Sequence, residues 1–249
     1  MIDPQAPVEV FDEIDSTILE ARRRAESGEV GPVWLIAKQQ SAGRGRRGRS
    51  WVSYEGNLLA TYLFATRHPP AKIALLGFAT GIAIAEVIDV LLGRGRATLK
   101  WPNDVFVDGA KLAGIMLDSG SVDQDTTWVA LAFGVNLSAA PAAIDQRTIS
   151  LRHCLPPDAP ASEPLDFLDR LRPRLEAWSV RLEREGFEPL RAAWLSRAYG
   201  LGQEVRVMQG EQAIEGRIVG LSARGELELE TANGPRLIAA GDVFLSSTA

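Results

Sequence analysis

Short runs of β-branched and aromatic residues, each bounded by glycine or polar residues, recur through the first half of the chain. This pattern predicts strands at residues 33–38, 57–65, 98–101, 104–107, 111–118 and 128–137. Asp108 and Gly109 separate two of these runs, and this dipeptide favours the positive φ angles of a tight hairpin turn. The run at 128–137 is too apolar for an exposed strand, so we expect it in the middle of a sheet.

Helical segments are predicted between and after these strands. Residues 15–26 combine a Ser16/Thr17 start with helix-forming residues, and Gly28 follows where helices commonly end. The pattern predicts further helices at 72–94, 165–185 and 187–199, with the 165–185 helix interrupted or kinked by Pro173. Residues 139–164 are rich in proline and alanine without a sustained period, which is typical of a long surface loop.

The composition changes at Gly200–Gly202. After this point short alternating runs (EVRVM, AIEGRIVGL, ELELE, RLIAA and DVFL) are separated by glycine or asparagine turns, which predicts a small antiparallel barrel or sandwich. We therefore predict two domains, a larger one at 1–199 and a small β domain at 200–249.

The composition is that of an ordinary soluble globular protein. Of the 249 residues, 46% are hydrophobic and 24% are charged, and 27 Lys and Arg against 32 Asp and Glu give a net charge of −5. A generally basic protein that coats nucleic acid is therefore disfavoured. Cys154 is the only cysteine, and neither histidine belongs to a cluster with zinc-site spacing, so we expect no metal site and a reducing cytoplasm.

The chain start is acidic and lacks the charged and apolar regions of a secretory signal. The apolar run at 73–92 is long enough to span a bilayer, but Glu86 and Asp89 lie inside it and would be costly there. We interpret this run as a buried amphipathic helix and expect no membrane partner.

The most informative segment is GRGRRGRS at 43–50, in which three glycines alternate with four arginines. Glycine lets backbone N–H groups approach a polyanion, and the guanidinium fork hydrogen-bonds carboxylate and phosphate oxygens in pairs. The glycines also satisfy the dinucleotide fingerprint and nearly satisfy the P-loop pattern, but the following SWVSYEG is not helical and no ribose-binding acid follows. Taken alone, the segment also fits a solvated basic loop or a nonspecific RNA contact.

Three further segments carry polar groups near strand ends: KWPND at 100–104, KLAGIM at 111–116 and FGVNL at 133–137. Rigid polar groups at the end of a strand suit ligand binding, and Gly114 would let a bulky ligand ring approach the backbone. Each segment also has a purely structural explanation: Lys111 as a hairpin charge, Asn136 as a strand-end cap and Asp104 as a turn residue.

Together, and in this order, DST at 15–17, QQSAGRGRRGRSW at 39–51, KWPND, KLAGI and FGVN resemble the biotin protein ligases, also called biotin–acetyl-CoA-carboxylase ligases. The resemblance extends over nearly the whole chain, because the terminal β segment looks like the small SH3-like domain of that family. It implies an α+β fold, with a mixed sheet packed with helices as in class II synthetases. Regulatory members carry a winged-helix DNA-binding domain, for which there is no room before Val8, so we expect no DNA binding.

The resemblance implies a cytoplasmic enzyme that joins biotin to the α-phosphorus of MgATP and then transfers the biotinyl group to one lysine of a carrier protein. Its cofactors would be ATP and Mg²⁺, and its partner a biotin carboxyl carrier domain of acetyl-CoA carboxylase or a related carboxylase. A homodimer is also compatible with it. The alternatives are a lipoate or octanoate ligase with the same chemistry, a DNA-contacting biotin sensor, and an RNA-binding module.

The resemblance also implies roles for individual residues. The catalytic cations are Lys111, Arg44 and Arg46, which would lie between the two anionic reactants and offset their repulsion. Biotin-binding residues are Ser16, Thr17, Gln40, Arg44, Gly45, Arg46, Lys111, Gly114 and Ile115. ATP-binding residues are Arg46, Arg47, Arg49, Trp51, Asn103, Asp104, Lys111 and Asn136. Trp51 is expected to stack on or beside adenine, and Asp104 is one candidate for the general base of the transfer step.

Overall fold

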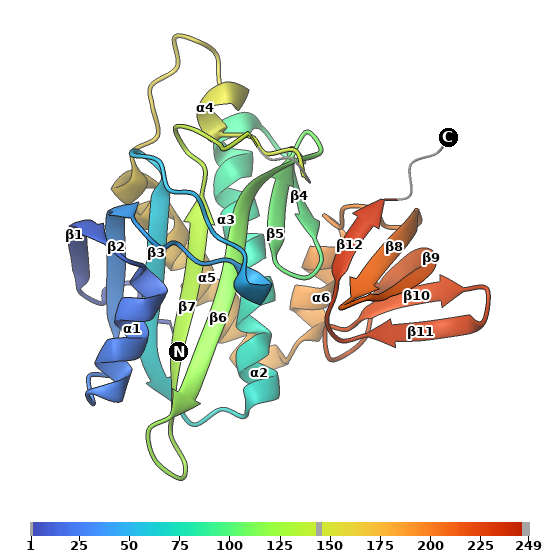
Figure 1. The fold of residues 1–249 in the computed structure, drawn as a ribbon, viewed down its shortest axis with the longest axis horizontal. Helices are drawn as coiled ribbons and strands as arrows, with labels where there is room; N and C mark the ends of the chain where they lie inside the picture. Colours follow the sequence, from blue (N-terminus) through green and yellow to red (C-terminus); the bar gives the residue numbers. More distant parts are fainter. Residues whose placement is uncertain (1, 143–145, 246–249) are drawn as a thin grey trace.

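The computed structural model describes residues 2–142 and 146–245 and contains two β-sheets (Figure 1). The larger is a seven-stranded mixed sheet in the order β1-β2-β3-β7-β6-β5-β4, with β1 parallel to β2 and all other neighbours antiparallel. Its strands are β1 (Val8–Ile14), β2 (Val33–Gln40), β3 (Leu58–Thr66), β4 (Ala97–Lys100), β5 (Asp104–Val107), β6 (Ala110–Ser121) and β7 (Thr127–Val135). The apolar β7 lies at the centre of this sheet, as predicted.

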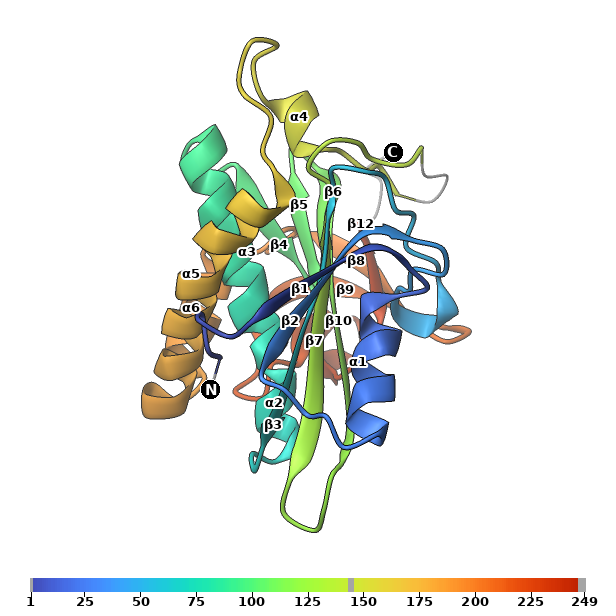
Figure 2. The ribbon, with the colours of Figure 1, turned by 90° about the vertical axis from the view of Figure 1, so that its left-hand side faces the viewer.

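Helices cover the two faces of the large sheet unequally, as Figure 2 shows. One face packs against α3 (Leu76–Leu92), α5 (Pro164–Glu185) and α6 (Glu188–Leu195), and the large core forms there. The other face carries only α1 (Thr17–Glu26), whose Ile18, Ala21 and Ala25 pack on Leu35 and Leu63. One short helix cannot cover a seven-stranded sheet. The ends of β6 and β7 beyond the N-terminus of α1 are therefore not covered by this helix.

The second sheet is antiparallel, in the order β11-β10-β9-β8-β12. It comprises β8 (Glu204–Gln209), β9 (Gln212–Leu221), β10 (Leu227–Thr231), β11 (Gly234–Ile238) and β12 (Asp242–Leu245). The indole of Trp101 donates a 3.0 Å hydrogen bond to the carbonyl of Gly225, and the buried Val205 and Ile218 join the large core. The second sheet therefore packs on the core of the larger unit, where β9 contacts α6.

The structure corrects several predicted elements. The strand β1 was not predicted, because its acidic alternating sequence lies at the edge of the sheet and is mostly exposed. The predicted helix at 72–94 is divided at Leu75 into α2 (Pro70–Ala74) and α3, and ends at Gly93, whose φ is 98°. The helix α5 continues through Pro173 instead of being interrupted there. The predicted loop at 139–164 contains the short helix α4 (Leu151–Cys154), and its residues 143–145 lie outside the described chain.

Within the described part of the chain, one helical segment, Pro70–Leu92, which comprises α2 and α3, is long and apolar enough to cross a membrane. Of an 18-residue apolar stretch of this segment, 61% is buried inside the fold, and α3 packs between the sheet and α5. This segment is thus the central core helix, as its sequence predicted.

Candidate active site

A cavity of about 150 Å³ lies beyond the N-terminus of α1, on the sheet face that this helix leaves uncovered. Side chains from α1, β6, β7, the KWPND turn and the loop that carries GRGRRGRS line it. The second sheet contributes Asp242, Val243 and Phe244. In Figure 1 this loop crosses in front of β6 and reaches toward the second sheet.

The cavity brings together most of the residues predicted for the site. Those that line it are Ser16, Thr17, Gln40, Arg44, Gly45, Arg46, Arg49, Trp51, Asn103, Asp104, Lys111, Gly114 and Ile115. The two that do not are Arg47 and Asn136. Predicted residues from Ser16 to Ile115, which lie far apart in the sequence, therefore converge on one cavity.

Two glycines form a flat floor under the cavity. Gly114 of β6 and Gly134 of β7 are register partners, and the indole of Trp51 lies across both. A Cβ atom at Gly134 would lie 2.4 Å from Cε2 of Trp51, and one at Gly114 would lie 3.1 Å from Cζ3. The sequence predicted that a ligand ring could approach Gly114; in the structure the ring of Trp51 lies there, and contact with a ligand stays a prediction.

The indole N–H of Trp51 is buried and has no hydrogen-bond partner among the described residues. A buried donor without a partner costs roughly 1–3 kcal/mol. The indole N–H is therefore available to an acceptor on a ligand. Contact between Trp51 and adenine stays a prediction.

Lys111 is a cation fixed on a strand. Its Nζ lies 2.7 Å from Oδ1 of Asp104 and 5.6 Å from the centroid of the Trp51 ring. Its backbone N–H donates to the carbonyl of Arg147 at 2.8 Å, so both ends of the residue are held. This arrangement presents an ammonium group to the cavity with little freedom to move.

Two further cations at the cavity are partly withdrawn from water. Burial lowers the pKa of the Lys100 amine, and the nearby Lys111 lowers it further; Lys100 lies 5.2 Å from the ring centroid of Phe106 and 5.7 Å from that of Phe244. Burial also lowers the pKa of Arg46. Because burial penalises these charges, an anion that enters the cavity relieves an existing cost. Lys100 was not assigned a role from the sequence, although it opens the KWPND segment.

The arginine loop is closed by backbone hydrogen bonds. The N–H of Gly45 donates to Arg49 O at 2.7 Å and the N–H of Trp51 to Gly43 O at 2.9 Å, around a single 3₁₀ turn at Arg46–Gly48. The guanidinium of Arg46 donates to Oδ1 of Asn103 at 3.0 Å. The loop is thus an ordered hairpin whose central arginine points to the KWPND turn.

The second sheet holds the same loop through one carboxylate. The Nη1 of Arg47 lies 3.0 Å from Oδ2 of Asp242, and the Nη2 of Arg49 lies 2.7 Å from Oδ1. Arg47 also donates to the carbonyl of Met208 at 3.3 Å. Sequence reasoning missed Asp242, since no local signal links it to a loop about 195 residues earlier.

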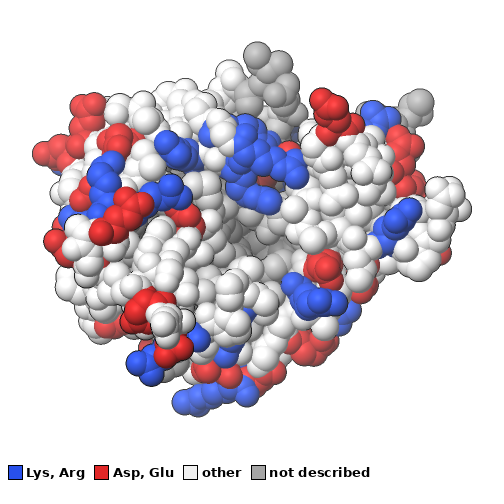
Figure 3. Space-filling model, turned by 60° about the horizontal axis from the view of Figure 1, so that its bottom comes forward, with Lys and Arg blue, Asp and Glu red and all other residues white. Residues whose placement is uncertain are grey.

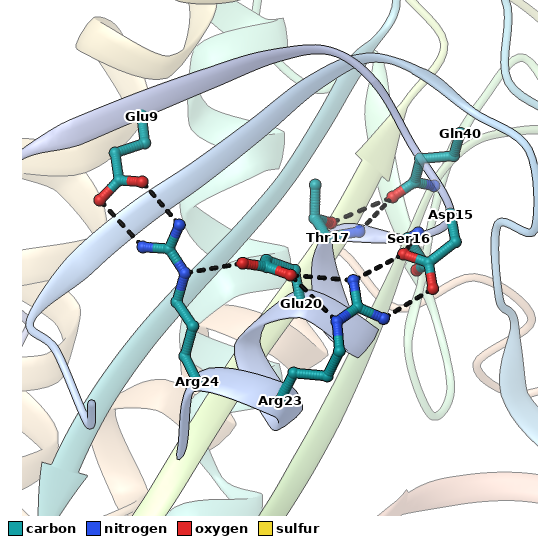
Figure 4. A network of polar contacts seen from close by, with 8 residues as sticks. All are labelled: Glu9, Asp15, Ser16, Thr17, Glu20, Arg23, Arg24 and Gln40. Carbon is teal, nitrogen blue, oxygen red and sulfur yellow. Dashed lines mark hydrogen bonds and ion pairs between the residues drawn. The ribbon is translucent and has the colours of Figure 1, made fainter. Parts of the chain in front are cut away.

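A hydroxyl and amide cluster forms the wall next to α1 (Figure 4). The Oε1 of Gln40 accepts hydrogen bonds from the N–H of Thr17 at 2.8 Å and from its hydroxyl at 3.1 Å. The hydroxyl of Thr61 donates to that of Thr17 at 2.8 Å. Ser16 and Thr17 are 2% and 3% exposed, so this wall is a rigid polar patch able to exchange hydrogen bonds with a small ligand.

Asn136 lies just after β7 and is 1% exposed. Its Nδ2 donates to the carbonyl of Ile149 at 3.3 Å, and its backbone N–H donates to Leu112 O at 2.9 Å. These contacts match the strand-end role considered for it, and its contact with a nucleotide stays a prediction. The same holds for Arg47, which turns toward Asp242.

The positive charge of the arginine loop does not continue into a large basic surface on the face that Figure 3 shows, because basic and acidic side chains are interleaved over it. Within residues 2–142 and 146–245, no group of three or more His, Cys, Asp or Glu side chains could hold a metal ion.

Comparison with known proteins places this geometry in a family. The biotin/lipoate A/B protein ligase family matches residues 10–136, and the biotin protein ligase C-terminal domain matches residues 200–246. A biotin–[acetyl-CoA-carboxylase] ligase from Paracoccus denitrificans is 36% identical over 233 residues, which cover 92% of this chain and 97% of that protein. The chain belongs to the biotin protein ligase family.

A further sequence and a solved structure that resemble this chain are also biotin protein ligases. The biotin–[acetyl-CoA-carboxylase] ligase of Mycobacterium tuberculosis is 31% identical over 95% of this chain and 88% of its own length. The structure of the Aquifex aeolicus biotin protein ligase in complex with biotin and ATP superposes with a TM-score of 0.78 at 26% identity, over 96% of this chain and 98% of that one. The predicted family and fold class, including the small C-terminal β domain of biotin protein ligases, are thereby confirmed.

Proposed function

We propose that this biotin protein ligase activates biotin with ATP to biotinyl-5′-AMP and transfers biotin to a lysine of the carrier domain of acetyl-CoA carboxylase. The observation that carries the proposal is the set of cations, Lys100, Lys111 and Arg46, that face one cavity beside a polar wall, two of which, Lys100 and Arg46, have a pKa lowered by burial. The similarity to two acetyl-CoA-carboxylase ligases supports the choice of substrate.

In the first step, an oxygen of the biotin carboxylate attacks the α-phosphorus of ATP, and the bond to the pyrophosphate oxygen breaks. Both reactants are anions, so the barrier depends on cations placed between them. Lys111 is fixed on β6, and Arg44 and Arg46 project from the loop above it. We assign these three cations to the carboxylate and the α-phosphate, with Arg49 and Lys100 nearer the rest of the nucleotide.

In the second step, the amine of the carrier lysine attacks the carbonyl carbon of the mixed anhydride, and AMP leaves. The amine must lose a proton, which Asp104, the phosphate of AMP or solvent can accept. In the structure Asp104 is paired with Lys111, so a base role for it requires that pair to open. The cavity holds the acyl phosphate away from bulk water, which protects it from hydrolysis.

Magnesium enters this proposal as part of MgATP. The two carboxylates that line the cavity, Asp104 and Asp242, are both paired with cations. This donor set does not fit a resident protein-bound metal. Mg²⁺ would instead arrive on the phosphates and neutralise part of their charge.

A lipoate or octanoate ligase is the alternative within the same family, whose description names both biotin and lipoate. The C-terminal domain match and the acetyl-CoA-carboxylase relatives favour biotin. The deciding experiment supplies purified protein with MgATP and either biotin, lipoate or octanoate, and measures pyrophosphate release. We expect release with biotin only, and biotin transfer when an apo carrier domain is added. Release with lipoate but not biotin would reject the proposal.

Three attributes of the enzyme stay predictions: the cytoplasmic location, the homodimer and the absence of DNA binding. The dimer prediction is tested by sedimentation velocity with and without biotin and ATP. A single species with the mass of the 27.0 kDa chain under all conditions would exclude it.

A further inference from the structure

A chain of alternating charges runs along the outside of α1, next to the polar wall of the cavity (Figure 4). Its members, in spatial order, are Glu9, Arg24, Glu20, Arg23 and Asp15. None of them lines the cavity, and the proposed chemistry uses none of them. Asp15 nevertheless directly precedes Ser16 and Thr17, which do line it.

Asp15 connects three parts of the structure. Its carboxylate accepts hydrogen bonds from both terminal nitrogens of Arg23, at 2.7 and 2.9 Å, and from the backbone N–H of Ser16 at 2.7 Å. These hydrogen bonds, that of Arg23 foremost, hold the pKa of the Asp15 carboxyl below its usual value. The carbonyl of Asp15 accepts the N–H of Ala42 at 2.8 Å, directly before the arginine loop. The residue thus ties α1 to both the polar wall and the loop.

The hydroxyl of Ser16 is not used to cap α1. A serine at this position commonly accepts, through its side-chain oxygen, a hydrogen bond from a backbone N–H in the first turn of the helix. Here the Asp15 carboxylate takes the N–H of Ser16, and Gln40 takes that of Thr17. The Ser16 hydroxyl therefore stays available on the cavity side.

The far end of the charge chain anchors α1 to the sheet. Arg24 forks onto Glu9 of β1 at 2.9 and 2.7 Å, and its Nε donates to Glu20 at 2.9 Å. Glu20 in turn accepts from Arg23 at 2.8 Å. Bidentate arginine–carboxylate contacts fix orientation better than single contacts do. Rotation or sliding of α1 would break several of them together.

We propose that Asp15 and Arg23 are positioning residues for biotin, which hold the α1 N-terminus so that Ser16 and Thr17 meet the ligand in a fixed geometry. The inference rests on the proposed function. It assigns Arg23 no contact with biotin or ATP, since its side chain is 49% exposed and lies outside the cavity. We expect the side-chain substitutions to act mainly on the biotin side of the site, because the ion pairs of the charge chain join its members to one another and none joins them to β6 or the KWPND turn among the described residues.

The test compares two neighbouring arginines on the same helix. Arg23→Gln removes the ion pairs with Asp15 and Glu20, whereas Arg22→Gln removes an ion pair with Asp118 of 2.6 Å and similar exposure. Calorimetry with biotin alone should show binding weakened about fivefold in Arg23→Gln and by less than about twofold in Arg22→Gln, as exposed ion pairs contribute little by themselves. The KM for ATP and the kcat at saturating biotin should stay within about twofold for both variants.

Two further variants separate positioning from plain stability. Asp15→Asn should weaken biotin binding like Arg23→Gln, and Arg23→Lys, which keeps the charge without the fork, should recover part of it. Thermal unfolding should shift only slightly in both Arg22→Gln and Arg23→Gln, because the ion pairs that they remove involve largely exposed arginines. Equal biotin affinity in these two variants would overturn the inference, as would a parallel loss of biotin affinity, ATP affinity and kcat. If the parent protein binds no biotin, the proposed function fails instead.

Discussion

The floor and the rim of the cavity are held by different forces. The floor is the backbone of β6 and β7, paired at Gly114 and Gly134 and buried under Trp51. The rim is the arginine segment at 43–50, attached to the second sheet through Asp242, whose partner Arg49 is 58% exposed. Exposed ion pairs contribute about 0–1 kcal/mol each, so the rim can rearrange at little cost while the floor cannot. We infer that the floor fixes the place of reaction and that the rim adapts to the ligand.

The largest expected effect is on the floor cation. Lys111→Ala should lower adenylate formation by about 10²–10³-fold, because a fixed charge aimed at the developing anion is lost and mobile arginines cannot replace it. Single-turnover release of pyrophosphate measures this. Lys38→Ala, which removes an exposed lysine paired with Asp12 on the same large sheet, is the matched control and should react normally. Near-normal turnover in Lys111→Ala would refute the assigned role.

The two floor glycines offer a graded comparison. Gly134→Ala places a Cβ 2.4 Å from the Trp51 ring, whereas Gly114→Ala leaves 3.1 Å. We expect Gly134→Ala to destabilise the fold by about 1–3 kcal/mol and to displace the ring, and Gly114→Ala to cost less. Denaturant unfolding measures the difference.

A second substitution identifies the cause. Adding Trp51→Ala to Gly134→Ala removes the ring that the new methyl group meets. The free energy of unfolding of the double variant should therefore be close to that of Trp51→Ala alone. An additive loss would show that Trp51 is not what requires glycine at position 134.

Local pattern was sufficient to predict most strands of the large sheet. The alternation of residues located β5 and β6 within a few residues, and the hairpin at Asp108–Gly109 has the positive φ angles of 50° and 71° that its sequence predicted. Family resemblance then assigned the loop arginines, Lys111 and the hydroxyl wall, nearly all of which line the cavity.

The elements that sequence reasoning missed depend on contacts distant in the chain. The strand β1 pairs in parallel with β2 across the whole of α1, and its exposed acidic residues give no strand signal. Gly134 looks like any small strand residue until Trp51, more than eighty positions earlier, is seen on top of it. The contribution of Asp242 likewise requires the packing of the second sheet on the loop.

The smallest expected effect concerns the rim. Asp242→Asn removes the charge shared by Arg47 and Arg49 but keeps the shape of the side chain, so the loop should open more often without unfolding of the second sheet. Arg47 has a φ of 56°, an uncommon conformation for a residue with a side chain, and its contacts with Asp242 and Met208 hold it there. Tryptic cleavage after Arg47 and Arg49 should accelerate about two- to fivefold, as the loss of an exposed ion pair permits.

Mass spectrometry of the fragments reports this cleavage site by site, and Glu215→Gln provides the control. Glu215 pairs with Arg206 inside the second sheet and is similarly converted from carboxylate to amide, without contact to the loop. Cleavage at the loop should be unchanged in it. Bound biotin and ATP should slow cleavage in the parent and in Asp242→Asn alike, because phosphate oxygens can then take the place of the carboxylate on the two arginines. If Asp242→Asn and Glu215→Gln are cleaved at the same rate, the second sheet does not restrain the rim, and the loop is ordered by its own backbone hydrogen bonds.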